Sequence, residues 1–195
     1  MISHPYPFKF VVIEGIDGVG KTTLTKLLVE RLNERSRAVR FEDVPFQNPT
    51  STLKRGIEDG DQEISFFTYV LSALHKDRHL RQLLQTQHVI ADRWFPSVLA
   101  HHEARGVDTQ VLNLDRLPLI APDHLFLLTA QESVRRARLE ARGILDEKDR
   151  RVREPGSELA RIETVFKRVI PTQVDTTLLS ADTLLTHILA HMHFN

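Results

Sequence analysis

The sequence predicts an α/β fold in which five parallel strands form one sheet with helices on both faces, giving three layers. Short apolar runs typical of buried strands alternate along the chain with longer segments of helical periodicity. This alternation favours a parallel sheet with helical crossovers. A glycine-rich turn also joins the first predicted strand directly to the first predicted helix. In such folds the loops that follow the strands gather at one edge of the sheet, where ligands bind.

The first strand and helix enclose the most informative stretch of the chain, FVVIEGIDGVGKTT at positions 10–23. The β-branched run Val11–Ile13 has no alternation, as expected of a strand buried on both faces. Residues 15–22 then match the P-loop pattern, whose backbone N–H groups cradle phosphates. In this motif Lys21 reaches the β- and γ-phosphates of a nucleotide and the Thr22 hydroxyl binds Mg²⁺. The predicted nucleotide-binding residues are Gly15, Asp17, Gly18, Val19, Gly20, Lys21, Thr22 and Thr23.

The remaining elements follow in order along a chain that we interpret as one domain over residues 1–195. Strands are predicted at 38–42, 89–91, 125–128 and 172–175. Helices are predicted at 21–32, 64–84, 97–105, 108–115, 159–169 and from about 182 onward. Thr129 and Glu132 have the spacing of a capping box, which predicts the start of one more helix.

An aspartate and an arginine follow the strand predicted at 89–91, at the edge of the sheet that also carries the P-loop. The carboxylate of Asp92 can orient Mg²⁺ beside the phosphates. The guanidinium of Arg93 can bind an anionic acceptor through two hydrogen bonds. A surface ion pair is the simpler interpretation, but the position after a buried strand favours a functional one.

Arginines are dense between residues 134 and 153, with acidic residues among them. The simpler interpretation is a solvated helix with ion pairs between neighbouring turns. The alternative is a short lid, over about 138–156, whose arginines close over ATP and exclude water. We expect one or two of these arginines to serve the lid.

The composition limits the classes of partner. The 195 residues contain 26 basic and 26 acidic side chains, so no global charge favours nucleic acid or a membrane surface. The sequence has no cysteine and no apolar run of membrane-spanning length. We therefore expect a cytoplasmic protein that binds small molecules and neither nucleic acid nor a membrane.

Several motifs together resemble the thymidylate kinase family of P-loop nucleotide kinases, over most of the chain. FVVIEGIDGVGKTT is close to that family's first motif, and DRWFPSVLA at 92–100 resembles its Asp-Arg-aromatic-x-x-Ser-x-x-Ala signature. PDHLFLL at 122–128 resembles a further strand motif, and the segment from Arg138 to Gly143 resembles its lid.

The resemblance implies transfer of the γ-phosphoryl group of Mg-ATP to a nucleoside monophosphate, with dTMP favoured. It implies that Asp17 approaches the 3′-hydroxyl of the acceptor sugar and that Arg93, with Ser97 of the same motif, binds the acceptor. Because the P-loop contains no arginine, it implies that Arg142 of the lid acts in catalysis with Lys21, Asp92 and Arg93. It further implies a homodimer, with the helix at 64–84 as the interface.

The chain departs from the family pattern after its second strand. The acidic pair Glu42 and Asp43 stands where the family has an Arg-Glu-Pro motif. A hydroxyl acceptor needs a general base, and Asp43 or Glu42 could supply it. A nucleoside or another hydroxyl-bearing metabolite therefore remains an alternative acceptor, with Asp43 in the acceptor site. A nucleotide-dependent switch is a weaker alternative, since the sequence lacks the Asn-Lys-x-Asp motif that reads guanine.

Overall fold

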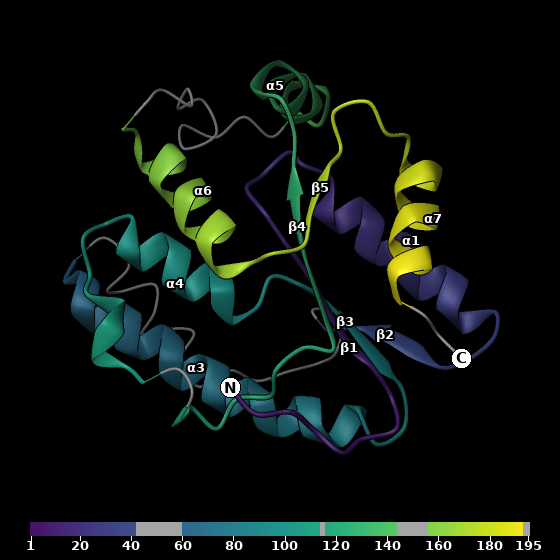
Figure 1. The fold of residues 1–195 in the computed structure, drawn as a ribbon, viewed down its shortest axis with the longest axis horizontal. Coiled ribbons are helices and arrows are strands. Elements are labelled where there is room, and N and C mark those ends of the chain that lie inside the picture. Colours follow the sequence, from purple (N-terminus) through teal and green to yellow (C-terminus); the bar gives the residue numbers. More distant parts are fainter. Residues whose placement is uncertain (42–59, 114–115, 144–155, 193–195) are drawn as a thin grey trace.

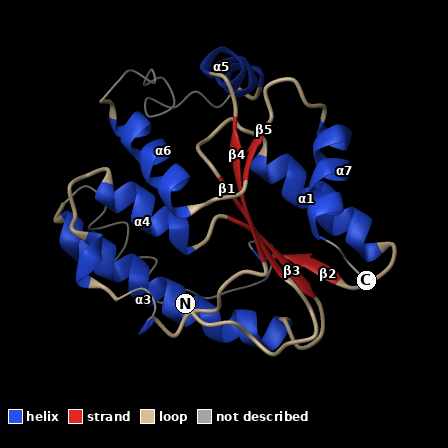
Figure 2. Cartoon of the chain, in the orientation of Figure 1, coloured by secondary structure: helices blue, strands red, loops and turns tan. Residues whose placement is uncertain are grey.

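The computed structural model describes residues 1–41, 60–113, 116–143 and 156–192. Figure 2 shows how strands and helices alternate along these residues. In chain order the elements are β1 (Phe10–Glu14), α1 (Lys21–Asn33), β2 (Ala38–Arg40), α3 (Gln62–Leu83), β3 (His88–Asp92), α4 (Phe95–Glu103), the 3-10 turn η2 (Thr109–Val111), β4 (His124–Thr129), α5 (Glu132–Ala141), α6 (Glu158–Val169), β5 (Gln173–Asp175) and α7 (Ala181–Met192).

Five strands of the described chain form one parallel sheet, which confirms the predicted architecture. The strand order is β2-β3-β1-β4-β5. Strand β1 is central, and its Ile13 lies in register with Asp92 of β3 and with Phe126 of β4. The helix after β1 and the helix after β3 cover opposite faces of the sheet (Figure 1). The loops that follow β1 and β3 therefore meet at the point where ligands bind in open α/β sheets.

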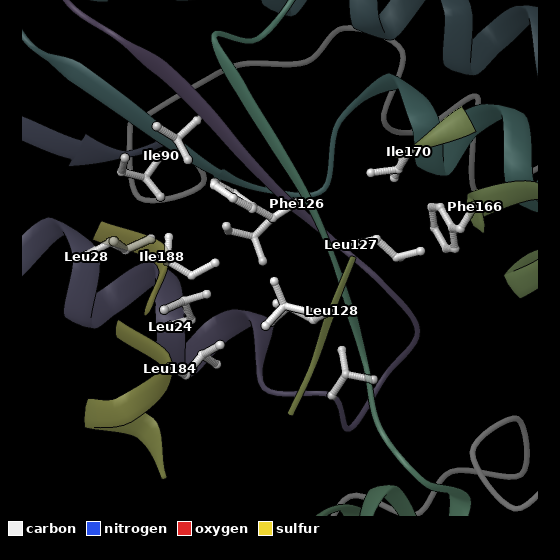
Figure 3. Close-up of a cluster of buried hydrophobic side chains, with 14 of the residues drawn as sticks. Leu24, Leu28, Ile90, Phe126, Leu127, Leu128, Phe166, Ile170, Leu184 and Ile188 are labelled. Carbon is white, nitrogen blue, oxygen red and sulfur yellow. The ribbon is translucent and has the colours of Figure 1, made fainter. Parts of the chain in front are cut away.

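Two apolar layers hold the helices on the sheet. On one face, side chains of β1 and β4 pack against α1 and α7, and Figure 3 shows this layer around Leu24, Leu28, Leu184 and Ile188. On the other face, Phe10 and Val12 pack against α3 and α4. All five residues of β1 are buried, as the apolar run Val11–Ile13 predicts for its centre, and the acidic Glu14 at its end is buried as well. The rigid centre of the sheet thus ends directly at the P-loop.

The helix predicted at 108–115 is wrong within the described residues. Only the short turn Thr109–Val111 forms there, because the Asp108 side chain accepts a hydrogen bond from the Gln110 N–H at 2.9 Å and Leu112 already has extended backbone angles of −97° and 124°. Residues 114 and 115 lie outside the described chain. An aspartate that bonds two residues ahead favours a turn over a continuing helix.

The predicted capping box at Thr129 is also wrong. Thr129 continues strand β4, where it pairs with Asp175 of β5. Helix α5 begins later, with Gln131 as its N-cap residue and no side-chain capping bond. Glu132, the first helical residue, instead binds the Arg135 guanidinium at 2.7 and 2.8 Å. The pairing of two strands therefore overrides a local helix-start pattern.

None of the helices in the described ranges has the length and apolar content that a membrane span requires.

Candidate active site

The P-loop has a backbone that only glycine adopts without strain. Gly15 and Gly18 have φ angles of 140° and 87°. A Cβ atom on Gly15 would lie 2.5 Å from the Leu128 carbonyl oxygen, and one on Gly18 would lie 2.7 Å from the Arg135 Cγ. The loop ends at Gly20, the N-cap residue of α1, where no side chain makes a capping bond. Phosphate oxygens can take the place of that missing cap.

Lys21, the first residue of α1, is buried and lies against the P-loop. Its ammonium donates to the Ile16 carbonyl oxygen at 2.9 Å and to the Asp17 carboxylate at 3.3 Å. Burial and the nearby Arg93 lower the pKa of Lys21, while Asp17 and Asp92 oppose that effect. The ammonium is thus held beside the P-loop by two oxygen acceptors of the loop itself.

The side chains of Thr22 and Asp92 meet across the edge between β1 and β3. The Thr22 hydroxyl donates to the Asp92 carboxylate at 2.6 Å, although the two residues are far apart in the sequence. Asp92 ends β3 and is buried. A hydroxyl and a carboxylate oxygen side by side are ligands of the type that Mg²⁺ prefers.

Arg93 has an unusual backbone and two polar contacts. Its φ angle is 76°, and it is the one non-glycine residue with a positive φ in the described ranges. Its guanidinium donates to the Asp17 carboxylate at 2.5 Å and to the Ser97 hydroxyl at 3.3 Å. Left-handed backbone at a non-glycine residue costs about 1–3 kcal/mol and often marks a functional site.

Asp17 brings the two cations together. Lys21 and Arg93 both bind the same oxygen of its carboxylate. Partial desolvation of this exposed side chain works against ionisation, yet Arg93 and Lys21 prevail and lower the pKa of Asp17 to about 2. At neutral pH the Asp17 carboxylate is therefore ionised and able to accept a hydrogen bond from a hydroxyl group.

The sequence interpretation missed a role for Glu14. This residue is fully buried at the end of β1, and its carboxylate accepts hydrogen bonds from Trp94 and Ser97 at the start of α4. Burial raises the pKa of Glu14, opposed by Arg93 and by the bonds from Ser97 and Trp94. A lone acidic residue at the end of an otherwise apolar strand was the available sequence signal.

Two arginines of α5 make polar contacts toward the P-loop, and the first of them is buried, unlike the solvated side chain that the simpler interpretation of the charge pattern predicts. Arg135 is 2% exposed and donates to the Asp17 carbonyl oxygen at 3.3 Å. Arg138 donates to the hydroxyl and carbonyl oxygens of Thr176 at 2.9 and 2.8 Å. The Thr176 hydroxyl lies 3.0 Å from both the Val19 and the Thr129 carbonyl oxygens, and its one proton is shared between these two acceptors. Helix α5 therefore fixes the P-loop through polar contacts as well as packing.

The other predicted site residues are placed as follows. Thr23 is exposed on the first turn of α1. Arg142 is exposed at the C-cap of α5, and among the described contacts its side chain makes none with the P-loop. Glu42 and Asp43, together with lid residues 144–155, lie outside the described residues. The described residues therefore bring the P-loop and the Asp92-Arg93 segment together.

The chain is similar to known proteins over most of its length. A family model described as thymidylate kinase matches residues 13–186. A probable thymidylate kinase of Thermococcus kodakarensis is 33% identical over 174 residues, which cover 78% of this chain and 84% of that protein. A probable thymidylate kinase of Pyrococcus horikoshii is 35% identical over 154 residues, with 72% and 74% covered.

A solved structure has a similar fold. The thymidylate kinase of Candida albicans superposes with a TM-score of 0.68 over 95% of this chain and 91% of that one, at 19% sequence identity. At 19% sequence identity, this similarity supports the fold alone.

Proposed function

The chain belongs to the thymidylate kinase family, and from this premise we propose that it transfers the γ-phosphoryl group of ATP to dTMP, giving dTDP and ADP. The observation that carries this proposal is the convergence of Lys21 and Arg93 on Asp17. One cation belongs to the P-loop and the other follows β3, so a donor and an acceptor phosphate can approach each other between them. Such positioned charges supply most of the catalysis in phosphoryl transfer.

On the donor side, the backbone N–H groups of the P-loop and the ammonium of Lys21 bind the ATP phosphates. Thr22 and Asp92 are the residues that would hold Mg²⁺, because their oxygen atoms lie 2.6 Å apart beside the P-loop. When bound, the ion offsets the negative charge of the phosphate oxygens. Lys21 is already desolvated, so its charge acts at short range in a site of low dielectric.

On the acceptor side, the guanidinium of Arg93 binds the monophosphate. That group is ionised at neutral pH and needs no general base. The ionised Asp17 carboxylate accepts a hydrogen bond from the acceptor sugar, and Ser97 keeps the Arg93 side chain in place. These roles agree with those that the family resemblance implies.

We also propose that residues 1–195 form one kinase domain and that residues 138–156 form its lid. Arg142, at the start of that segment, closes over the transferring phosphoryl group together with a neighbouring arginine. Arg135 and Arg138 are already engaged with Glu132 and Thr176, so Arg142 is a better candidate for this movement than either of them. A cytoplasmic location stays a prediction from the sequence, which has no cysteine and no apolar run of membrane-spanning length.

The test of the proposed acceptor is an ATP-consumption assay on the purified protein with dTMP, thymidine and other nucleosides and monophosphates in parallel. Turnover with dTMP and none with thymidine supports the proposal. Turnover with a nucleoside and none with any monophosphate would contradict it and would assign Glu42 or Asp43 as a general base.

We propose that the protein forms a homodimer through helix α3. Ile64, Phe67 and Leu71 are 52%, 46% and 57% exposed and lie on one face of this helix at helical spacing. The opposite face, which includes Phe66 and Val70, packs on the sheet. A stripe of large apolar side chains on the outer face of a core helix is typical of a contact between subunits.

The variant Phe67→Lys tests this interface. Placing a charge in an apolar contact is expected to weaken the dimer at least about tenfold in dissociation constant, which corresponds to about 1.4 kcal/mol. Sedimentation velocity over a concentration series measures the change. The control is Leu178→Lys, which alters an equally apolar residue, 94% exposed, after β5. Identical mass distributions for wild type and both variants would contradict an interface at α3.

A further inference from the structure

Glu14 is a fully buried carboxylate that donor binding and the acceptor contacts do not use directly. It ends β1 and precedes Gly15 of the P-loop. Its three described hydrogen bonds all run to the start of α4. One oxygen accepts from the Trp94 N–H at 2.8 Å and the Ser97 N–H at 3.2 Å, and the other accepts from the Ser97 hydroxyl at 2.6 Å.

Helix α4 has no capping group of its own. Its N-cap residue is Trp94, whose side chain makes no capping bond, and Pro96 in the first turn has no N–H. The Glu14 carboxylate oxygens therefore act as the cap from a different element, at the positive end of the helix. This arrangement joins the last residue before the P-loop to the first turn of α4.

The bond from Trp94 also fixes the backbone of Arg93. The direction of the Trp94 N–H is set by the backbone angles of Arg93, which has a φ of 76°. On the other side of this residue, the Arg93 N–H donates to the Ile13 carbonyl oxygen at 3.0 Å. The left-handed conformation is thus held by two successive residues of β1, Ile13 and Glu14.

The Ser97 hydroxyl provides a second link, to the Arg93 side chain. Because this hydroxyl donates its proton to Glu14, its lone pairs face the Arg93 guanidinium, which donates to it at 3.3 Å. A hydroxyl has one proton, so its direction depends on the acceptor that Glu14 offers.

We propose that Glu14 is a positioning residue for the acceptor step, which fixes Arg93 through the Trp94 N–H and the Ser97 hydroxyl so that the guanidinium meets the acceptor phosphate. The proposal rests on the proposed function of Arg93 in binding the monophosphate. It gives β1 a dual role, since the same strand end carries the donor loop and holds the acceptor arginine.

The variant Glu14→Gln separates positioning from helix capping. The glutamine oxygen can still accept from the two backbone N–H groups, whereas its NH₂ group would face the Ser97 hydroxyl and turn the serine proton away from its present acceptor. We expect kcat/KM for dTMP to fall about tenfold or more, with KM for ATP within about twofold of the wild type. Ser97→Ala is expected to give the same pattern, and the double variant should lose less than the product of the two effects.

Asp77→Asn is the matched control. Asp77 is a carboxylate 3% exposed that binds the Ile120 N–H at 2.8 Å and Arg81 at 2.6 Å, in a part of α3 outside the candidate site. This variant should lower the melting temperature and leave both substrate constants unchanged. If Glu14→Gln behaves in the same way, or if it affects ATP and dTMP equally, Glu14 is a structural residue only and the proposal is wrong.

A second readout needs no acceptor. The ¹⁵N chemical shift of the Arg93 Nε–H group, assigned by its loss in Arg93→Lys, should move in Glu14→Gln and in Ser97→Ala but not in Asp77→Asn. An unchanged shift would overturn the positioning role. This measurement is independent of the proposed function. If the wild type does not phosphorylate dTMP, the proposed function is wrong, but the chemical shift still shows whether Glu14 positions Arg93.

Discussion

Lys21→Ala is expected to lower kcat at least about 10³-fold and to leave the fold intact, because it removes a preorganised charge from the transferring phosphate. The ammonium is buried and already held beside the P-loop by the Ile16 carbonyl oxygen and the Asp17 carboxylate. Its removal leaves the apolar contacts of Leu24 and Leu28 with the sheet in place, so α1 should stay folded. Steady-state rates with saturating ATP and dTMP, together with a thermal melt, measure both quantities.

The control for this prediction is Lys26→Ala. Lys26 is exposed on the same helix, so the substitution removes an equal charge without touching the P-loop. Its kcat should match that of the wild type. Full activity in Lys21→Ala would refute the assignment of the P-loop as the donor site.

Arg93→Lys is expected to lower kcat/KM for dTMP about 10²-fold, while KM for ATP stays within about twofold of the wild type. The fall in kcat/KM corresponds to a loss of about 2–3 kcal/mol of acceptor binding in the transition state. Lysine keeps the charge but offers a single donor point, whereas the guanidinium presents a planar fork that can bind phosphate and Ser97 together. Initial rates over a matrix of ATP and dTMP concentrations separate the two constants.

Arg105→Lys provides the comparison for Arg93. Arg105 lies just after α4, the helix that Arg93 precedes, and pairs with Glu158 at 2.8 Å. The kinetic constants of Arg105→Lys should therefore match those of the wild type. Arg93→Gly adds a stability readout, since glycine adopts the 76° backbone angle freely. That variant should not use dTMP, and its melting temperature should change little, because relief of the left-handed strain offsets the lost contacts with Asp17 and Ser97. An equal loss of ATP and dTMP binding in Arg93→Lys would contradict the acceptor assignment.

The central part of the site could be predicted from the sequence because it depends on local patterns. The glycine spacing before Lys21 and the apolar run of β1 predict a strand, a glycine-rich turn and a helix, and the structure has β1, positive φ angles at Gly15 and Gly18, and α1 in this order. The carboxyl ends of parallel strands share one edge, so the meeting of Thr22 and Asp92 also follows from the strand pattern.

The supporting contacts could not be predicted, because they depend on elements far apart in the sequence. Glu14 and Ser97 come together only when α4 packs beside the end of β1. The simpler interpretation of the arginine pattern was a solvated helix, yet Arg135 is buried against the Asp17 carbonyl oxygen. The misplaced helix start at Thr129 has the same origin, since the pairing of β4 with β5 decides where the strand ends.

The most direct test of the account is ³¹P NMR of a mixture of the purified protein, ATP, magnesium and dTMP. The account predicts the resonances of dTDP and ADP, formed in equal amounts at a rate proportional to the protein concentration, and their absence with Lys21→Ala. Unchanged dTMP, with ATP hydrolysed to phosphate or spent only on thymidine in a parallel sample, would contradict it.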